Sequence, residues 1–369
     1  MEQNKAKRDA GLDLLKTVAI ICVCYCHYGC MYVDSTDMTI KGIIKILIRL
    51  FNCTAVPIFF MTNGALTLHK EYSVERCLQK AAEILKKLML YIPITVLGYN
   101  FIKNGEFLDF KTFLNRCWNW QGNGVQHLWF LFSLMCIYLL YPFICYVLKQ
   151  QKKVKIIYGG LLFIFTFGNS AINLMNDIYH YFKYGGGEYF FDTNFFNGPN
   201  FFYGWYSWVL VYFIAGDILW KHILNKKFIK RQTTVVLLIL GVISAIFYVW
   251  ACRIMAIYMS DTYFMLYFWG YNQIFMLIIA VLIFCTVLQY IKISNTLQRI
   301  LEITGDSTLG ILFFHRFIGE IVKKIFANYN IDINTAGIMY GIISTGIVFC
   351  VSLCLTVLIK RWKIVRKFF

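Results

Sequence analysis

The sequence predicts an all-α, polytopic membrane protein, a bundle of about ten transmembrane helices. Three observations support this fold class. Of the 369 residues, 59% are hydrophobic and 15% are charged, and the mean hydropathy is +0.60. The apolar residues gather in membrane-length runs, and Lys and Arg gather between them in alternate segments. A soluble domain of this length does not need so much apolar surface.

A helix of about 20 apolar residues crosses a bilayer, and ten runs reach that length. Because they fill most of the chain, we expect residues 1–369 to form a single integral-membrane domain. The runs cover about 12–33, 43–68, 84–102, 127–148, 154–175, 203–223, 234–255, 264–288, 305–326 and 337–359.

The positive-inside rule orients this bundle. Both ends of the chain and alternate connecting segments are rich in Lys and Arg, and the intervening segments are poorer. An even number of spans then places both termini in the cytoplasm, in a multi-pass protein of the cell membrane. The same asymmetry explains the net charge of +17 without a nucleic-acid partner. The 13 cysteines form no CxxC pair, so we expect reduced side chains rather than a disulfide framework.

The first apolar run contains two ionisable residues, Lys16 and His27. Such residues inside a membrane segment are functional-site candidates by default. Their separation in a helix is three turns plus roughly 20°, with a rise of about 16 Å, so both lie on one face. A histidine can take a proton near neutral pH, which makes His27 the candidate base. Lys16, nearer the cytoplasmic end, can hold an anionic group such as a phosphate.

Other interpretations of these residues remain open. Lys16 can pair with Asp13 three residues earlier and extend to the inner headgroups without a catalytic task. His27 can be a polar residue satisfied inside the bundle. One helix face carries Cys24, His27 and Cys30, so metal binding is a further hypothesis. No fourth ligand is apparent nearby, so we expect no metal.

Several segments resemble the integral-membrane acyltransferase 3 family. GLDLLKTVAIICVCYCH is similar to its opening helix, which typically reads G-L-D-x-L-R, ten residues and a histidine; Lys16 replaces the arginine. AVPIFFMTNGALTL resembles the P-x-F-F-x-x-S-G stretch, with Asn63 replacing serine. HLWFL, from His127, resembles the opening of a family span. GDSTLGILFFHRF resembles S-x-G-I-Y-L-x-H, with His315 in the histidine position and Arg316 after it.

The resemblance implies an O-acyltransferase, most often O-acetyl, with acetyl-CoA or another acyl-CoA as donor. The implied acceptor is a hydroxyl of a cell-surface carbohydrate or related envelope molecule, and no permanently bound cofactor is expected. His27 and Lys16 would be catalytic, and Lys16 and Asn63 would bind the donor. His127, Trp129 and His315 would form the substrate side of the site. His127 as an interfacial residue facing water, and His315 as a structural residue, remain alternatives.

A transporter or flippase for an envelope substrate is the competing function, since ionisable residues inside spans are also common there. No convincing inverted repeat of broken helices supports it. A membrane-embedded binding or sensor module is a third hypothesis, and the lack of a predicted soluble domain argues against it. The motifs of serine hydrolases, zincins and P-loop enzymes are absent from the sequence.

Two stretches are expected to lie outside the spans. In 106–126, apolar residues at helical spacing predict an amphipathic interfacial helix (Phe110, Phe113, Leu114, Cys117 and Trp118). The stretch 176–203 is rich in aromatic residues and is expected outside, either as a sugar-binding surface or as a plug on the bundle.

Two local features concern helix geometry. Pro57, Pro93 and Pro142 fall inside predicted spans, as simple kinks or as breaks that line a cavity. Asp306, Ser307 and Thr308 predict a helix N-cap.

Overall fold

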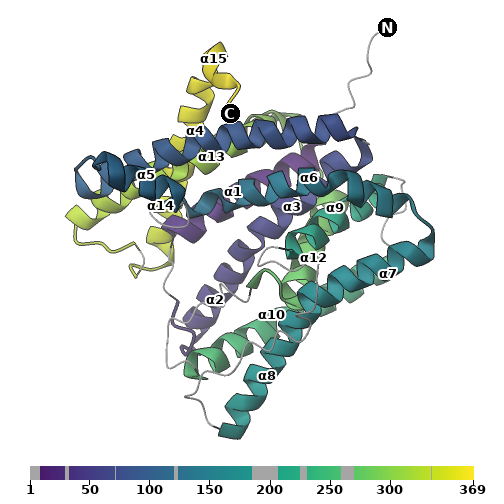
Figure 1. Ribbon diagram of the computed structural model, residues 1–369. Helices are drawn as coiled ribbons and strands as arrows, with labels where there is room; N and C mark the ends of the chain where they lie inside the picture. Colours follow the sequence, from purple (N-terminus) through teal and green to yellow (C-terminus); the bar gives the residue numbers. More distant parts are fainter. Residues whose placement is uncertain are drawn as a thin grey trace.

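The computed structural model describes residues 9–29, 33–70, 72–119, 124–184, 207–224, 231–258, 270–333 and 335–369. In these ranges every element is helical and there is no strand (Figure 1). The helices are α1 Ala10–Tyr28, α2 Ile40–Cys53, α3 Ala55–Thr67, η1 Leu68–Lys70, α4 Val74–Asn104, α5 Phe110–Trp118, η2 Gln126–Leu128, α6 Trp129–Lys149, α7 Lys152–Phe163, the π-helical η3 Ile164–Gly168, α8 Asn169–Tyr184, α9 Trp208–Leu224, α10 Arg231–Tyr258, α12 Ile274–Tyr290, α13 Asn295–Asn328, α14 Ile338–Ile359 and α15 Lys363–Arg366.

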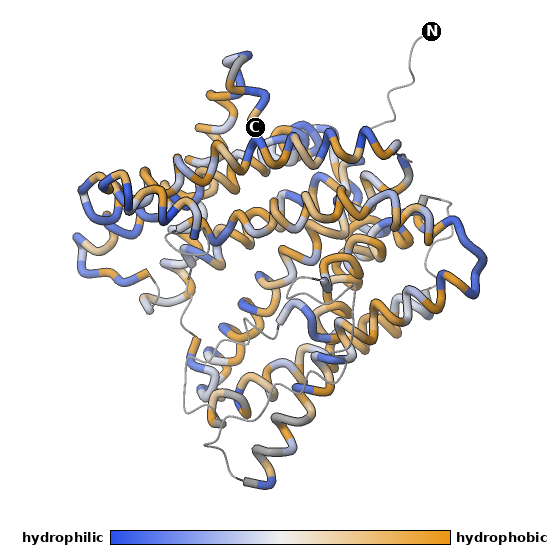
Figure 2. Tube along the Cα trace, in the orientation of Figure 1, coloured by the Kyte–Doolittle hydropathy of each residue, from blue (hydrophilic) through white to orange (hydrophobic). Residues whose placement is uncertain are grey.

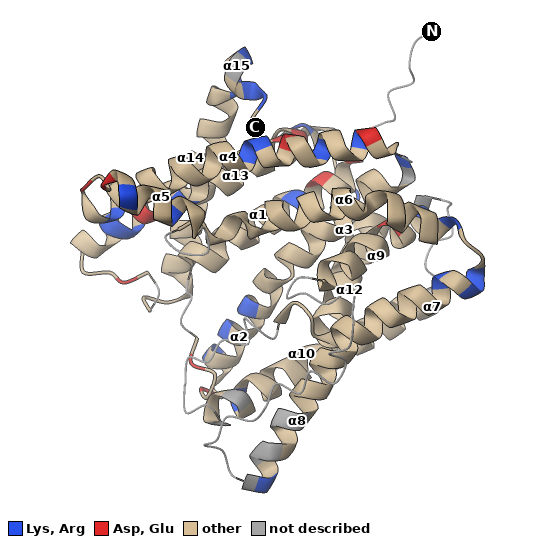
Figure 3. Ribbon diagram, in the orientation of Figure 1, with Lys and Arg blue, Asp and Glu red and all other residues tan. Residues whose placement is uncertain are grey.

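The all-α membrane class is confirmed, and the number of spans is not. Within the described ranges, six helical stretches are long and apolar enough to cross a membrane. Two further predicted runs correspond to α9 and α12, which have 17 residues each. The remaining two lie in α4 and α13, which carry charged side chains along their length (Figure 3). Apolar residues dominate α10, α12 and α14 (Figure 2). The six stretches are Ala10–Tyr28, Ile40–Thr67, Gln126–Lys149, Lys152–Met175, Gln232–Ile254 and Ile338–Ile359.

The second predicted span is divided into two helices. α2 ends at Cys53 and α3 begins at Ala55, with Pro57 in the first turn of α3. A proline lacks the N–H that would bond to the carbonyl four residues earlier, and its ring collides with that carbonyl. Pro57 therefore marks a broken helix, whereas Pro93 and Pro142 lie inside the continuous helices α4 and α6.

Helix α1 runs through the centre of the bundle and packs against α3, α13 and α14. Its contact with α13 depends on a glycine: a Cβ added at Gly319 would lie 2.1 Å from Cε2 of Tyr28. The Ser344 hydroxyl on α14 donates a hydrogen bond to the Tyr28 carbonyl. The end of α1 that carries His27 is thus fixed by α13 and α14.

Helices α3 and α9 cross in direct backbone contact through two glycines. A Cβ at Gly64 would lie 1.8 Å from the Phe213 carbonyl oxygen, and one at Gly216 would lie 2.0 Å from the Met61 carbonyl oxygen. Small residues allow this approach, as at other helix interfaces in membranes. The crossing holds α3, with Phe59 and Asn63, in place beside α1.

The predicted N-cap at Asp306–Thr308 is wrong, because α13 is continuous through these residues. Its cap is Ser294, whose hydroxyl accepts a hydrogen bond from the Leu297 N–H. Thr308 instead donates to the Gly305 carbonyl, 3.1 Å away, as hydroxyls inside helices do. His315 therefore lies in the middle of a 34-residue helix rather than two turns from its start.

The amphipathic helix predicted in 106–126 is present as α5. Phe110 and Trp118 are 75% and 86% exposed, so an apolar stripe faces outward. Asp109 caps α5 by accepting from the Thr112 N–H, and hydrogen bonds from Thr112 lower the pKa of its carboxyl. The placement of α5 at a membrane interface stays a prediction. In 176–203, α8 continues to Tyr184, and the rest lies outside the described residues.

Candidate functional site

A cavity of about 600 Å³ lies between α1, α3, α4, α6 and α13. From α1 the lining includes Lys16, Ile20, Val23 and His27, and Cys26 lies in it beside His27. The first four recur every three or four residues, as one face of a helix does. The sequence placed Lys16 and His27 on one face, and the structure opens that face into a single cavity.

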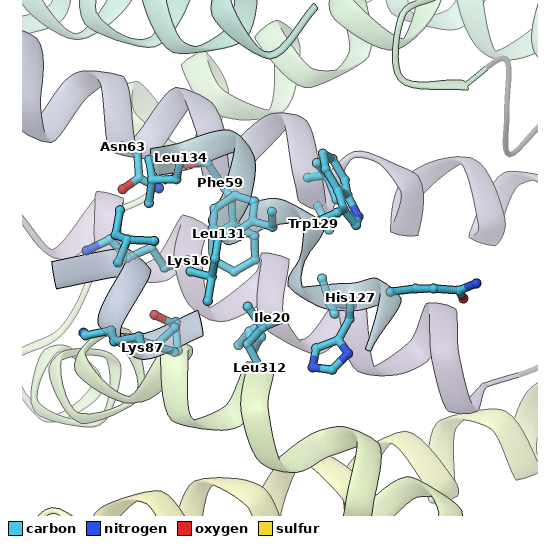
Figure 4. A pocket seen from close by; sticks show the side chains of 18 of the residues that line it. Lys16, Ile20, Phe59, Asn63, Lys87, His127, Trp129, Leu131, Leu134 and Leu312 are labelled. Carbon is cyan, nitrogen blue, oxygen red and sulfur yellow. Dashed lines mark hydrogen bonds between the residues drawn. The ribbon is translucent and has the colours of Figure 1, made fainter. Parts of the chain in front are cut away.

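One end of the cavity has an excess of positive charge, with three lysines and one carboxylate, Glu83. Lys16, Lys87 and Asn63 lie together there, away from His127 (Figure 4). Lys16 Nζ is 3.4 Å from Asp13 Oδ1, so the pairing considered as an alternative exists while Lys16 still lines the cavity. The Asn63 amide donates to the Phe59 carbonyl at 2.8 Å. That bond leaves the Asn63 side-chain oxygen for other partners.

Lys80 adds a further cation to the lining. Its Nζ lies 5.0 Å from the ring centre of Tyr72 and 5.3 Å from that of Tyr138. Lys80 precedes the apolar run at 84–102 and lies in the second turn of α4. Neither Lys80 nor Lys87 is a predicted site residue. Their spacing of seven residues, two turns on one helix face, is the signal that could have placed them in the site.

The middle of the cavity is apolar. Trp129 lines it and lies 5.9 Å from Trp208 and 6.4 Å from Tyr271, ring centre to ring centre. Such a wall suits a hydrocarbon chain or the apolar face of a sugar better than a charged group. The other apolar side chains here include Ile20, Phe59, Phe130, Leu131, Leu134 and Leu312.

The opposite end carries three histidines from three helical segments. The ring centre of His315 lies 5.2 Å from that of His27 and 5.2 Å from that of His127. His27 and His127 line the cavity. His315 is completely buried and packs between them without being part of the lining. The structure thus brings the three predicted histidines together, with His315 behind the other two.

Each histidine has a defined neighbour at Nδ1. For His127 it is the Gly124 carbonyl oxygen at 3.0 Å, and for His315 the Leu312 carbonyl oxygen at 2.6 Å. The Nε2 atoms of His127 and His315 are buried and make no hydrogen bond to any residue in the described part of the chain. For His27 the neighbour is Arg316, whose Nη1 lies 3.4 Å from Nδ1.

Arg316 also lines the cavity and is held by aromatic rings. Its guanidinium lies 5.6 Å from the ring centre of Tyr28 and 5.3 Å from that of Tyr99. The Tyr28 hydroxyl is within hydrogen-bonding distance of the Arg316 carbonyl oxygen (2.9 Å) and of Glu320 Oε1 (3.1 Å). Arg316 is not among the predicted site residues. An arginine inside a predicted span was the available signal.

Among the described residues, no group of three His, Cys, Asp or Glu side chains is arranged to hold a metal ion. Each described cysteine is a free thiol. The lining therefore combines a cationic end, an apolar middle and an end with imidazoles and a guanidinium. These groups can bind an anion, hold an apolar chain, exchange a proton and stabilise a developing negative charge.

Comparison with known proteins gives one match. The family model described as "Acyltransferase domain" (acyltransferase 3) matches residues 9–359, nearly the whole chain. No curated protein and no solved structure matches.

Proposed function

This chain belongs to the acyltransferase 3 family, and we propose that it transfers an acyl group, most often acetyl, from an acyl-CoA to a hydroxyl of a cell-surface carbohydrate or related envelope acceptor. One observation carries the proposal: a single cavity joins the cations at Lys16 and Lys87 to the imidazoles of His27 and His127. Acyl transfer needs a group that takes the hydroxyl proton and a donor near the developing oxyanion.

The cationic end suits the donor. Coenzyme A carries phosphates, which bind lysine ammonium groups as point charges. Its thioester arm would then lie along the apolar middle of the cavity, whose volume of about 600 Å³ is typical of a small-molecule site. Lys16 would hold the phosphate or thioester region, with Asn63 as a hydrogen-bonding partner. No cofactor needs to stay bound between turnovers, since the acyl-CoA is a substrate.

The histidine end suits the acceptor. His27 and His127 offer ring nitrogens to a hydroxyl, and Trp129 offers a flat apolar face to a sugar ring. His315, which does not line the cavity, would act by orienting the two rings it contacts. With both termini in the cytoplasm, the donor would enter from inside and the acceptor from outside, so that the two meet near His27.

The test is transfer of labelled acetyl from acetyl-CoA to a cell-envelope fraction by the purified protein. The wild type should transfer label, and His27→Ala should not, with activity normalised to folded protein. Cys350→Ala, an exposed position on α14, is the matched control and should behave as the wild type. Near-normal turnover by His27→Ala would remove His27 from the site.

A further inference from the structure

We propose that His127, rather than His27, is the general base of the transfer, and that His27 donates its Nε2 proton to the reacting carbonyl oxygen. The assignment rests on the proposed function. It is carried by the different partners that the structure gives to Nδ1 in the two rings.

The neighbour of His27 Nδ1 is an obligate donor. An arginine guanidinium has N–H groups only and accepts no hydrogen bond. With Arg316 Nη1 at 3.4 Å, His27 Nδ1 must therefore supply the lone pair. A neutral imidazole has one N–H, so the proton of His27 lies on Nε2. A second proton on His27 would place two positive charges side by side, which disfavours the imidazolium that a general base must become.

The neighbour of His127 Nδ1 is an obligate acceptor. The Gly124 carbonyl oxygen, 3.0 Å away, can only accept, so Nδ1 of His127 carries the proton. Its Nε2 then carries a lone pair. This atom is buried and makes no hydrogen bond to any described residue. The same reasoning applies to His315 and the Leu312 carbonyl. His127 lines the cavity and His315 does not, so of these two rings His127 is the one that a bound substrate can contact.

Gly124 has a backbone conformation and surroundings that favour glycine. Its φ is +81°, in the left-handed region that glycine tolerates best. A Cβ at this position would lie 2.6 Å from the Tyr99 ring, so a larger residue would shift the loop. The glycine places its carbonyl oxygen 3.0 Å from Nδ1 of His127, which lies in η2 just before α6.

The chemistry balances. The acceptor hydroxyl gives its proton to His127 Nε2 while its oxygen bonds to the thioester carbon. The carbonyl oxygen becomes an oxyanion, which accepts a hydrogen bond from His27 Nε2–H. When the intermediate collapses, the C–S bond breaks and its electron pair goes to sulfur. The coenzyme A thiolate takes the proton from His127, which leaves an ester, a thiol and neutral His127.

The tautomers can be measured directly. The chain has six histidines, so ¹⁵N-histidine labelling with one His→Gln variant per site assigns each ring by NMR. In the purified protein at pH 8 we expect Nε2–H for His27 and Nδ1–H for His127 and His315. The same tautomer on His27 and His127, or the reverse pair, would overturn the assignment.

Kinetics provide the second test, with glutamine as the matched replacement. Its side-chain amide keeps an N–H donor near the position of Nε2 but cannot act as a base. His27→Gln should keep at least a tenth of the turnover, whereas His127→Gln should lose about 10²-fold or more, the usual contribution of a general base. The control is Lys323→Gln, an exposed residue of α13, which should be unchanged.

Failure of the His127 assignment can be distinguished from failure of the proposed function. An active wild type in which His127→Gln turns over as fast as His27→Gln, or faster, would overturn this assignment alone. A wild type that transfers acyl groups from no acyl-CoA would overturn the proposed function and the assignment with it.

Discussion

Arg316 Nη1 lies 3.4 Å from Nδ1 of His27, although 289 residues separate the two in the chain. The contact joins the first helix to α13 and fixes a permanent cation beside the imidazole. The guanidinium lies within 6 Å of the ring centres of both Tyr28 and Tyr99.

Replacing Arg316 should alter the tautomer of His27 while the protein remains folded. In Arg316→Met the lone pair at His27 Nδ1 loses its donor, so the ring should become a mixture of tautomers in the ¹⁵N spectrum. Turnover should fall about tenfold or more, because a hydrogen bond to a charged group contributes about 1.5–3 kcal/mol. Arg316→Lys keeps the charge without the planar guanidinium, so its turnover should lie between those of the wild type and Arg316→Met. Identical spectra for wild type and Arg316→Met would show that Arg316 does not orient His27.

Part of this site is predictable from the sequence. Lys16 and His27 share a face because helix periodicity is local, and the cavity confirms that face. The contact between Arg316 and His27 is not local, since it depends on how α13 crosses α1. The start of α13 was missed because Ser294 and the Asp306–Thr308 segment both offer capping side chains.

The number of membrane spans is likewise difficult to predict from local sequence patterns. The third predicted run begins at 84, after most of the basic residues between Lys70 and Lys87. In the structure α4 starts at Val74 and points Lys80 and Lys87 into the cavity. Charged residues that face an internal cavity are compatible with a membrane helix. They nevertheless lower the mean hydropathy on which such counts depend.

The crossing of α3 and α9 gives a stability prediction. Gly64→Ala should lower the free energy of unfolding by about 1–3 kcal/mol, because the new methyl group collides with the Phe213 carbonyl. Gly346→Ala on α14 is the matched control, since a Cβ there meets no atom within 4 Å. Thermal unfolding of both variants in detergent checks this. Equal melting temperatures would mean that the helices separate at little cost.

Topology is a prediction that reporter fusions can check. Lys and Arg asymmetry places the segment around Lys153 inside the cell and the segment around Gly186 outside. A reporter fused after Lys153 should therefore be active only in the cytoplasm, and one near Gly186 only outside. Reports from the same side would contradict the orientation assumed for donor and acceptor.

Lys16 stands where the family usually has arginine, and a variant series can separate its possible roles. If the position supplies only positive charge to the donor, Lys16→Arg should remain active. Lys16→Met keeps the stem without the charge and should raise the KM for acyl-CoA about tenfold or more, by loss of a charge-assisted hydrogen bond. Loss of activity in Lys16→Arg as well would show that the site requires the compact ammonium.

The ion pair with Asp13 supplies the control for that series. Lys16 Nζ is 3.4 Å from Asp13 Oδ1, and Asp13 is 1% exposed, so Lys16→Met leaves a buried carboxylate with a lost partner. If Lys16 serves only that pair, Lys16→Met should be destabilised, and adding Asp13→Asn should restore both stability and transfer. If Lys16 binds the donor, the double variant should recover its melting temperature and still use acyl-CoA poorly. Acetyl transfer by purified variants, normalised to folded protein, decides between them, and full activity of Lys16→Met would remove the residue from the site.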